Sequence, residues 1–118
     1  DKSLRKQIMS IETDSTPLGA PKNPDTCNAF AIYSLMADEN QIAEMRANYL
    51  GGNYGYGHAK QAIFELITEK FKTERERYNY YINNLDEVDD LLKKGAAKAS
   101  LVADGVLKRV REKLGFEK

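Results

Sequence analysis

The chain has 118 residues, 42% of them hydrophobic, and its 18 lysines and arginines balance 18 aspartates and glutamates. That size suits one domain whose core needs neither disulfide nor metal. Zero net charge excludes the whole-molecule basic field of a DNA-coating protein. One cysteine and one histidine exclude a zinc site of the Cys/His type. No apolar run approaches the roughly 20 residues that cross a bilayer, so no membrane partner is expected.

Two helices separated by a long loop are predicted at the start of the chain. Apolar residues at i, i+4 and i+7 predict a short helix over residues 2–12. The turn-forming stretch 13–17 ends it, because Asp and Ser bond local backbone and proline disfavours helix before it. The loop is long for a small domain, so it is either ordered for a reason or mobile. Asp25 is a candidate N-cap for a largely buried helix over residues 26–36.

The next helix and the longest periodic run follow. Asp38, with Gln41 three residues later, has the pattern of a capping box. This helix is expected to end at the glycine pair 51–52. An apolar stripe then continues through residues 58–83, and its weakening near residue 72 predicts a kink.

Two more helices are expected towards the C-terminal end. Asn84 or Asp86 caps a short helix that ends at residues 93–95, where lysines suit the helix dipole. A last helix is expected over residues 96–114, before a glycine. No run of residues alternates between apolar and polar. The sequence therefore predicts an all-α fold, a compact bundle of about six helices forming a single domain over residues 1–118.

A glycine-rich stretch, residues 51–60, joins two of the predicted helices. It reads Gly-Gly-Asn-Tyr-Gly-Tyr-Gly-His-Ala-Lys. Glycines permit close backbone approach, and Lys60 adds a charge near a helix N-terminus, where anions bind. One interpretation is a nucleic-acid loop with aromatic faces, and the other is a tight connector with tyrosines packed as wedges. The P-loop and dinucleotide motifs do not fit, because the Gly-Lys-Ser/Thr and the preceding strand are missing.

Catalytic chemistry has little support in the sequence. His58 is the sole obvious base near neutral pH, and Cys27 is the sole thiol. No motif pairs them, so we expect His58 to be a surface or capping residue and Cys27 a small core residue. We assign no catalytic residue and no metal ligand.

Basic and tyrosine side chains are candidates for RNA contact. The cations are Lys60, Arg75, Arg77, Lys108, Arg109, Arg111 and Lys113, and the tyrosines are Tyr54, Tyr56, Tyr80 and Tyr81. Sequence-specific RNA binding uses stacking on splayed bases and hydrogen bonds to their edges. The alternative is that the charged helix faces are solvated and the tyrosines half-buried.

Six short motifs stand out along the chain. They are Ile8-Met9-Ser10-Ile11-Glu12-Thr13-Asp14-Ser15, Pro24-Asp25-Thr26-Cys27-Asn28, Gly52-Asn53-Tyr54-Gly55-Tyr56-Gly57-His58-Ala59-Lys60, Arg75-Glu76-Arg77-Tyr78, Gly95-Ala96-Ala97-Lys98-Ala99 and Val110-Arg111-Glu112-Lys113-Leu114-Gly115. Together they resemble the C-terminal helical domain of bacterial tryptophanyl-tRNA synthetases. They occur in the family's order and at its spacing, and they cover almost the whole chain. One departure is Lys72-Thr73, where many relatives have a proline.

The resemblance implies a class I aminoacyl-tRNA synthetase that joins tryptophan to tRNA(Trp), using ATP with Mg. It implies a cytoplasmic homodimer in which this anticodon-binding domain follows a Rossmann-fold catalytic domain. The chain holds no HIGH-like and no KMSKS-like sequence. We therefore expect it to be a fragment that binds RNA but does not catalyse and carries no cofactor of its own.

The resemblance also implies an RNA-binding site. Lys60 matches a family position that faces the anticodon, and Thr13, Asp14 and Ser15 match a turn near the same side. Asp14 could accept from a base amino group, as carboxylates do from cytosine N4, and the tryptophan anticodon CCA supplies two such groups. Arg77 and Tyr56 complete the predicted RNA-binding set. The competing hypotheses are a helical protein-interaction module without RNA binding and a small stand-alone enzyme using His58.

Overall fold

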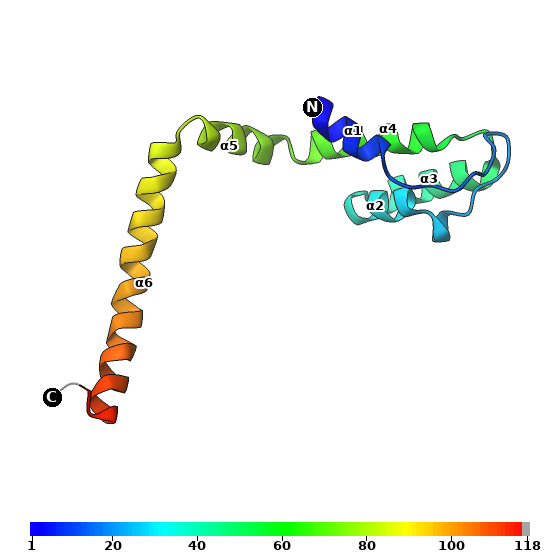
Figure 1. Ribbon diagram of the computed structural model, residues 1–118. Helices are drawn as coiled ribbons and strands as arrows, with labels where there is room; N and C mark the ends of the chain where they lie inside the picture. The colour runs from blue at the N-terminus through cyan, green and yellow to red at the C-terminus, as the bar shows by residue number, and fades with distance from the viewer. Residues whose placement is uncertain (117–118) are drawn as a thin grey trace. The chain divides into compact units, whose positions relative to one another are not determined.

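The computed structural model describes residues 1–116, which form six α-helices and one short 3-10 helix (Figure 1). No strand occurs among these residues, so the all-α prediction is confirmed. The chain divides into two compact units, Asp1–Thr73 and Glu74–Lys118. None of the described helices is both long and apolar enough to cross a membrane.

The first unit contains four α-helices. They are α1 (Lys2–Met9), α2 (Asn28–Met36), α3 (Glu39–Gly51) and α4 (Tyr56–Lys70), with the 3-10 helix η1 (Pro24–Thr26) before α2. Helix α4 packs against both α1 and α2, and α2 also contacts α3. The short helix η1, which follows the long loop, contacts α2 and α3.

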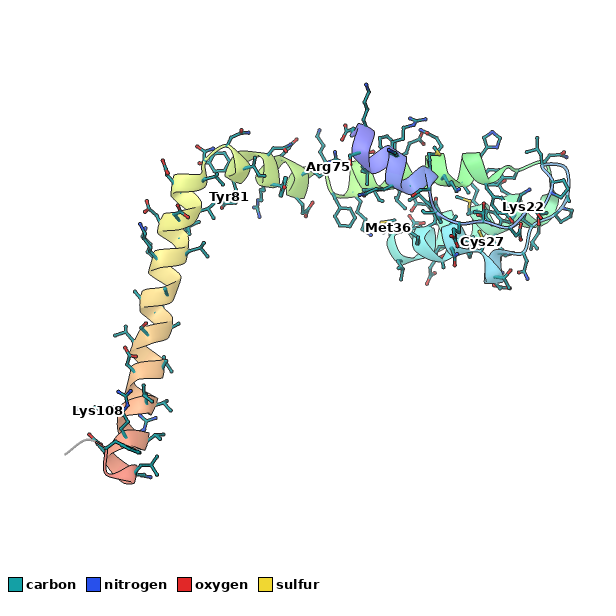
Figure 2. All side chains as sticks on the ribbon, viewed as in Figure 1. Lys22, Cys27, Met36, Arg75, Tyr81 and Lys108 are labelled. Atoms are coloured by element: carbon teal, nitrogen blue, oxygen red, sulfur yellow. The ribbon has the colours of Figure 1, made fainter. Side chains whose placement is uncertain are left out.

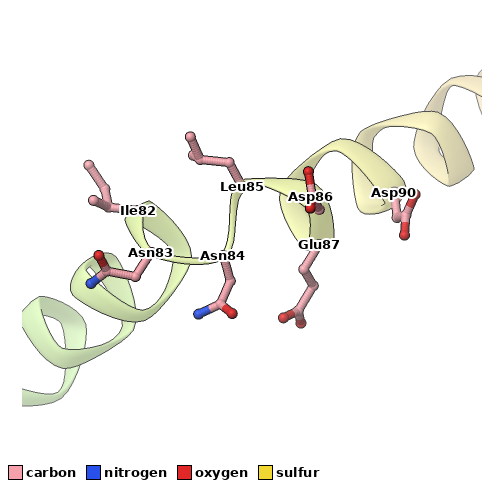
Figure 3. A pocket seen from close by; sticks show the side chains of 7 residues that line it. All are labelled: Ile82, Asn83, Asn84, Leu85, Asp86, Glu87 and Asp90. Atoms are coloured by element: carbon pink, nitrogen blue, oxygen red, sulfur yellow. The ribbon is translucent and has the colours of Figure 1, made fainter.

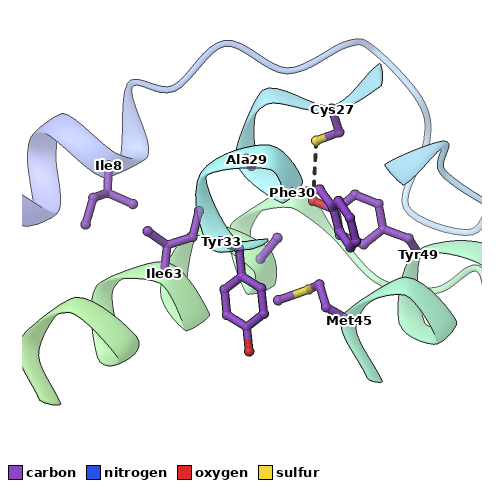
Figure 4. Packing of buried hydrophobic residues seen from close by; sticks show 9 residues of the cluster. Ile8, Cys27, Ala29, Phe30, Tyr33, Met45, Tyr49 and Ile63 are labelled. Carbon is purple, nitrogen blue, oxygen red and sulfur yellow. Dashed lines mark hydrogen bonds between the residues drawn. The ribbon is translucent and has the colours of Figure 1, made fainter. Parts of the chain in front are cut away.

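Aromatic and aliphatic side chains from all four helices fill the core of this unit (Figure 4). Tyr49 and Ile63 are fully buried, and the ring of Phe30 meets Tyr49 edge-on at 5.4 Å between centroids. Cys27 is buried with its Sγ 3.4 Å from the Tyr49 hydroxyl, which confirms it as a small core residue. Helix α2 is less buried than its apolar sequence predicts, because Leu35 remains 84% exposed.

Two predicted helix boundaries are wrong. Helix α1 ends at Met9 rather than residue 12, because Ser10 caps it and its hydroxyl donates to the Gln7 carbonyl at 2.7 Å. Asp25 does not cap α2. It lies inside η1, where Asn23 is the cap, and its carboxylate accepts from Arg46 at 2.8 Å. The N-cap of α2 is Cys27, which makes no side-chain cap bond.

The start and end of α3 match the sequence prediction. Asp38 accepts from the Gln41 backbone N–H at 2.8 Å, and the Gln41 side chain accepts from the Asp38 N–H at 3.0 Å. This reciprocal pair is a capping box. The helix ends at Gly51, and its C-cap Gly52 has a φ of 74°, where side chains other than glycine are strained.

The long loop after α1 is ordered around a buried lysine (Figure 2). Lys22 is only 2% exposed, and its Nζ donates to the carbonyls of Pro17 at 3.1 Å and Ala20 at 3.4 Å. Its backbone N–H donates to the Tyr49 carbonyl at 2.7 Å. The ammonium also lies 5.2 Å from the centre of the Tyr56 ring. One residue thus connects the loop to α3 through its backbone and to the start of α4 through its side chain.

Replacing Lys22 by methionine keeps an apolar stem of similar length and removes every donor. The loop carbonyls then lose their buried partners, so we expect a loss of roughly 1–3 kcal/mol of unfolding free energy. Urea unfolding of Lys22→Met measures it, with Lys2→Met on the exposed side of α1 as the control. Equal stability of the two variants would show that the loop does not depend on Lys22.

The second unit contains α6 (Leu85–Leu114) and, from Glu74 on, α5 (Lys72–Ile82). The helical run predicted over residues 58–83 is divided into two helices: α4 ends at Lys70 with Phe71 as its C-cap, and α5 starts at Lys72, where the sequence predicts a kink. The two helices predicted after residue 84 are instead one helix of 30 residues, α6. Gly95 lies within it, since a single glycine costs a helix only about 1 kcal/mol. Asn84 is the N-cap, and Gly115 ends the helix with φ 79°.

Helix α6 carries an apolar stripe that nothing in the described residues buries. Leu101 is 80% exposed and Val110 45% exposed.

At the start of α6, an open acidic pocket of about 520 Å³ is lined by Ile82, Asn83, Asn84, Leu85, Asp86, Glu87 and Asp90 (Figure 3). There the Tyr80 hydroxyl donates to Glu87 at 2.6 Å. This segment is the solvated helix start that its charges predict.

Candidate functional site

A polar cavity of about 230 Å³ lies where three separate segments of the first unit meet. It is lined by Glu12, Thr13, Asp14, Thr26, Cys27, Asn28 and Tyr56. These residues come from the turn after α1, from the junction of η1 with α2, and from the first residue of α4. Each segment belongs to a different one of the first three family-like motifs, so the fold brings those motifs to one place.

A carboxylate and a phenol form the centre of this cavity. The Tyr56 hydroxyl donates to Asp14 Oδ1 at 2.5 Å, and the Thr16 N–H donates to the same oxygen at 2.9 Å. These bonds hold the pKa of Asp14 below its usual value, the Tyr56 bond contributing most. Asp14 is therefore an exposed, ionised acceptor near neutral pH. Both of these bonds are made to Oδ1, so groups of the chain itself fix the orientation of this carboxylate.

The aromatic ring of Tyr56 packs against two neighbouring side chains. Its ring lies 6.2 Å from that of Tyr49, edge to face, and Lys22 lies near it. Burial and then the bond to Asp14 raise the pKa of Tyr56 to about 12. Tyr56 is therefore a neutral phenol that donates, and its position fixes the orientation of the Asp14 carboxylate.

Lys60 lies beside the turn that carries Asp14. It is on the second turn of α4, half-buried, and its Nζ donates to the Met9 carbonyl at 3.1 Å. That carbonyl is at the C-terminal end of α1, where cations are favourable. Lys60 thus fixes the end of α1 and places a positive charge just before the turn.

The structure brings together part of the predicted site. Thr13, Asp14 and Tyr56 line the cavity, while Ser15 is exposed in the same turn but does not line it. Arg77 is exposed on α5, in the second unit. Sequence reasoning missed Asn28, although it ends a recognised motif, because no chemistry had been assigned to that motif.

The glycine stretch has a clear structural role. A side chain at Gly52 would place its Cβ 2.8 Å from the Gly19 carbonyl oxygen. Tyr54 packs on Tyr49 with ring centres 5.9 Å apart, as a wedge. His58 is exposed, and its Nδ1 accepts from the Gly55 N–H at 3.2 Å, which confirms it as a capping residue. No group of His, Cys, Asp and Glu within residues 1–116 is arranged to hold a metal ion.

Comparison with known proteins gives one consistent family. No protein-family model matches the chain. It is 43% identical over 115 residues to a tryptophan–tRNA ligase of Fusobacterium nucleatum, covering 98% of this chain and 35% of that protein. It is 40% identical over 116 residues to the ligase of Campylobacter jejuni, covering 98% and 36%.

Solved structures agree. The crystal structure of the tryptophanyl-tRNA synthetase of Campylobacter jejuni matches with a TM-score of 0.89 at 40% identity, over 97% of this chain and 37% of that one. The chain thus spans about a third of the length of the relatives it matches. Over nearly all of its own length, this chain is similar to about a third of the length of tryptophanyl-tRNA synthetases, in sequence and in fold.

Proposed function

We propose that this chain is the anticodon-binding domain of a tryptophan–tRNA ligase, which charges tRNA(Trp) with tryptophan at the expense of ATP. The observation that carries the proposal is the cavity at which three family-like motifs converge. The carboxylate of Asp14 and the phenol of Tyr56 line this cavity, and Lys60 bonds the end of α1 just before the turn that carries Asp14. Edge hydrogen bonds and stacking are how proteins read unpaired RNA bases, and a lysine attracts the backbone phosphates.

The two candidate residues of the competing enzyme hypothesis, His58 and Cys27, have structural roles. His58 caps α4, and Cys27 contacts the Tyr49 hydroxyl inside the core. Both residues that a stand-alone enzyme would use are therefore occupied in contacts that stabilise the fold. We assign no residue of this chain to ATP, Mg or tryptophan, and we propose that those sites belong to a catalytic domain elsewhere in the ligase.

The exposed apolar stripe of α6 also favours an interaction with another protein surface. A helix of 30 residues with Leu101, Val106 and Val110 all exposed needs a cover in a stable protein. Because the matched ligases are nearly three times as long as this chain, we propose that their remaining part, the catalytic domain, packs on this stripe. We further propose a cytoplasmic homodimer. A helical interaction module without RNA binding is the alternative that this same stripe favours.

A matched pair of lysines on α4 tests the RNA proposal. Lys60 donates to the Met9 carbonyl at the end of α1, and Lys70 donates to the Met36 carbonyl at the end of α2, at 2.6 Å. Lys60→Ala and Lys70→Ala should therefore cost similar stability, about 1 kcal/mol each. In the full-length ligase, Lys60→Ala alone should weaken tRNA binding and lower its salt slope by roughly 1.

The catalytic readout separates binding from chemistry. Tryptophan-dependent pyrophosphate exchange should be unchanged in both lysine variants, because the proposed ATP site lies outside this chain. Loss of tRNA affinity to the same extent in Lys60→Ala and Lys70→Ala would contradict the assignment of Lys60 to the RNA interface.

A further inference from the structure

A second polar cavity, of about 140 Å³, is formed by residues of α2, α3, α4 and the glycine stretch. It is lined by Tyr33, Gln41, Glu44, Met45, Asn48, Tyr54 and Ala62, so it shares no residue with the cavity beside Asp14. Pockets that take drug-sized ligands measure roughly 300–1,000 Å³. A small ligand, or one end of a longer one, therefore suits this cavity.

The hydroxyl of Tyr33 has no partner in the fold although the residue is buried. Tyr33 is 8% exposed, and Figure 4 shows its hydroxyl at the end of the ring that points away from the other labelled core residues. That oxygen makes no hydrogen bond within residues 1–116. An unpaired buried polar group costs stability. A phenol that is unpaired and lines a cavity therefore indicates a ligand.

Carboxylates surround the two phenols of this cavity. Burial, and then the charges of Glu44 and Asp38, raise the pKa of Tyr33. The pKa of Tyr54 is raised as well, first by burial and further by charges that include Glu44 and Glu65. In the part of the chain that the structure describes, neither glutamate forms an ion pair. The cavity therefore lies in a negative field, which favours a cation and disfavours an anion.

The lining combines apolar surface with hydrogen-bond acceptors. Met45 and Ala62 supply the apolar surface. Glu44 and Asn48 are four residues apart on α3, so they share one face of that helix. The Glu44 carboxylate, the Asn48 amide oxygen and the Tyr33 phenol oxygen can each accept a hydrogen bond. An ammonium group has three donors and no acceptor, so an ammonium on a short alkyl stem complements this lining.

We propose that this cavity binds the ammonium end of a small aliphatic amine, with Tyr33, Glu44 and Asn48 accepting its N–H protons and Met45 lying beside its alkyl stem. The site goes beyond the proposed anticodon binding and does not depend on it. Two sources carry this chemistry. One is a free amine, and the other is a lysine side chain from a part of the ligase outside this chain.

Saturation-transfer NMR on the full-length ligase tests the free amine, with n-butylammonium as the ligand and n-butanol as its uncharged counterpart. Butylammonium should bind saturably, and n-butanol should not at the same concentrations. Glu44→Gln should weaken butylammonium binding about 10- to 150-fold, the usual effect of losing a hydrogen bond to a charged group. Glu39→Gln, at an exposed residue of the same helix outside the cavity, should keep the wild-type affinity.

Tyr33→Phe separates ligand binding from a structural role. The ring stays in the core and only the hydroxyl is lost, so the variant should bind butylammonium several-fold more weakly than wild type. Its melting temperature should not fall, because the hydroxyl has no partner in the fold. A lower melting temperature with unchanged amine binding would overturn the assignment of this hydroxyl to a ligand.

Lysine acetylation of the same full-length proteins tests the second source. If a lysine of the ligase fills the cavity, wild type will not bind butylammonium, and one lysine outside this chain should be acetylated at least several-fold faster in Glu44→Gln than in wild type or Glu39→Gln. Equal amine binding in wild type, Glu44→Gln and Tyr33→Phe overturns the proposal. So does the absence of amine binding when no lysine responds to Glu44→Gln. Should Glu44→Gln fail to fold, Tyr33→Phe decides by either readout, and neither readout uses tRNA.

Discussion

Replacing Phe30 by alanine should lower the free energy of unfolding by about 3–5 kcal/mol, the usual cost of removing a buried aromatic ring. Phe30 is 6% exposed, meets Tyr49 edge-on and lies under the guanidinium of Arg46 at 5.2 Å. Its loss leaves a cavity between α2 and α3 that the surrounding helices can fill only in part. Since domains of this size are stable by about 5–15 kcal/mol, the variant should be close to unfolding.

The same helix provides the control. Leu35 is 84% exposed, so Leu35→Ala removes little buried surface and should change stability within about 0.5 kcal/mol, as surface substitutions do. Chemical unfolding of both variants measures the difference. Similar midpoints for Phe30→Ala and Leu35→Ala would show that α2 does not form the core as described.

A second large effect is expected from Gly52→Ala. Gly52 has φ 74° and ψ 177°, a region that only glycine occupies readily, and strain there costs about 1–3 kcal/mol. The added Cβ would also lie 2.8 Å from the Gly19 carbonyl oxygen, a backbone atom of the loop after α1. The loop would have to move away from the end of α3, and the total loss should exceed the strain alone.

The neighbouring glycine is a matched control. Gly51 is the last residue of α3, and a Cβ there meets nothing within 4 Å. Gly51→Ala should therefore be neutral or stabilise by up to about 1 kcal/mol, because alanine favours the helix. Thermal unfolding of the two variants tests this. If they have the same melting temperature, the close approach of the loop to Gly52 is not a constraint on the fold.

Local signals in the sequence predicted most of the helix ends. The pattern Asp38 to Gln41 became a capping box, and glycines at 52 and 115 end helices. Such signals work because the capping groups are neighbours in sequence. The predicted break at residues 93–95 was wrong for the same local reason. A glycine after two lysines resembles a helix end, but the helix costs little to continue through it.

The site was only partly predictable. Asp14 and Tyr56 were both named from the sequence, but their hydrogen bond joins residues 42 apart, which no local pattern reveals. Lys22 was overlooked because a lysine is almost never fully buried without a partner. Here loop carbonyls supply the partners. The cavity depends on these long-range contacts, so its shape, and the place of Asn28 in it, needed the structure.

Cross-linking from the anticodon tests the central claim most directly. A photoreactive nucleotide is placed in the anticodon loop of tRNA(Trp), bound to the full-length ligase and irradiated, and the attached peptide is identified. The cavity predicts attachment within residues 10–16, 26–28 or 54–60, and its loss when unlabelled tRNA(Trp) competes. Cross-links confined to other parts of the ligase, with none in these three segments, would contradict the assignment of the anticodon to this cavity.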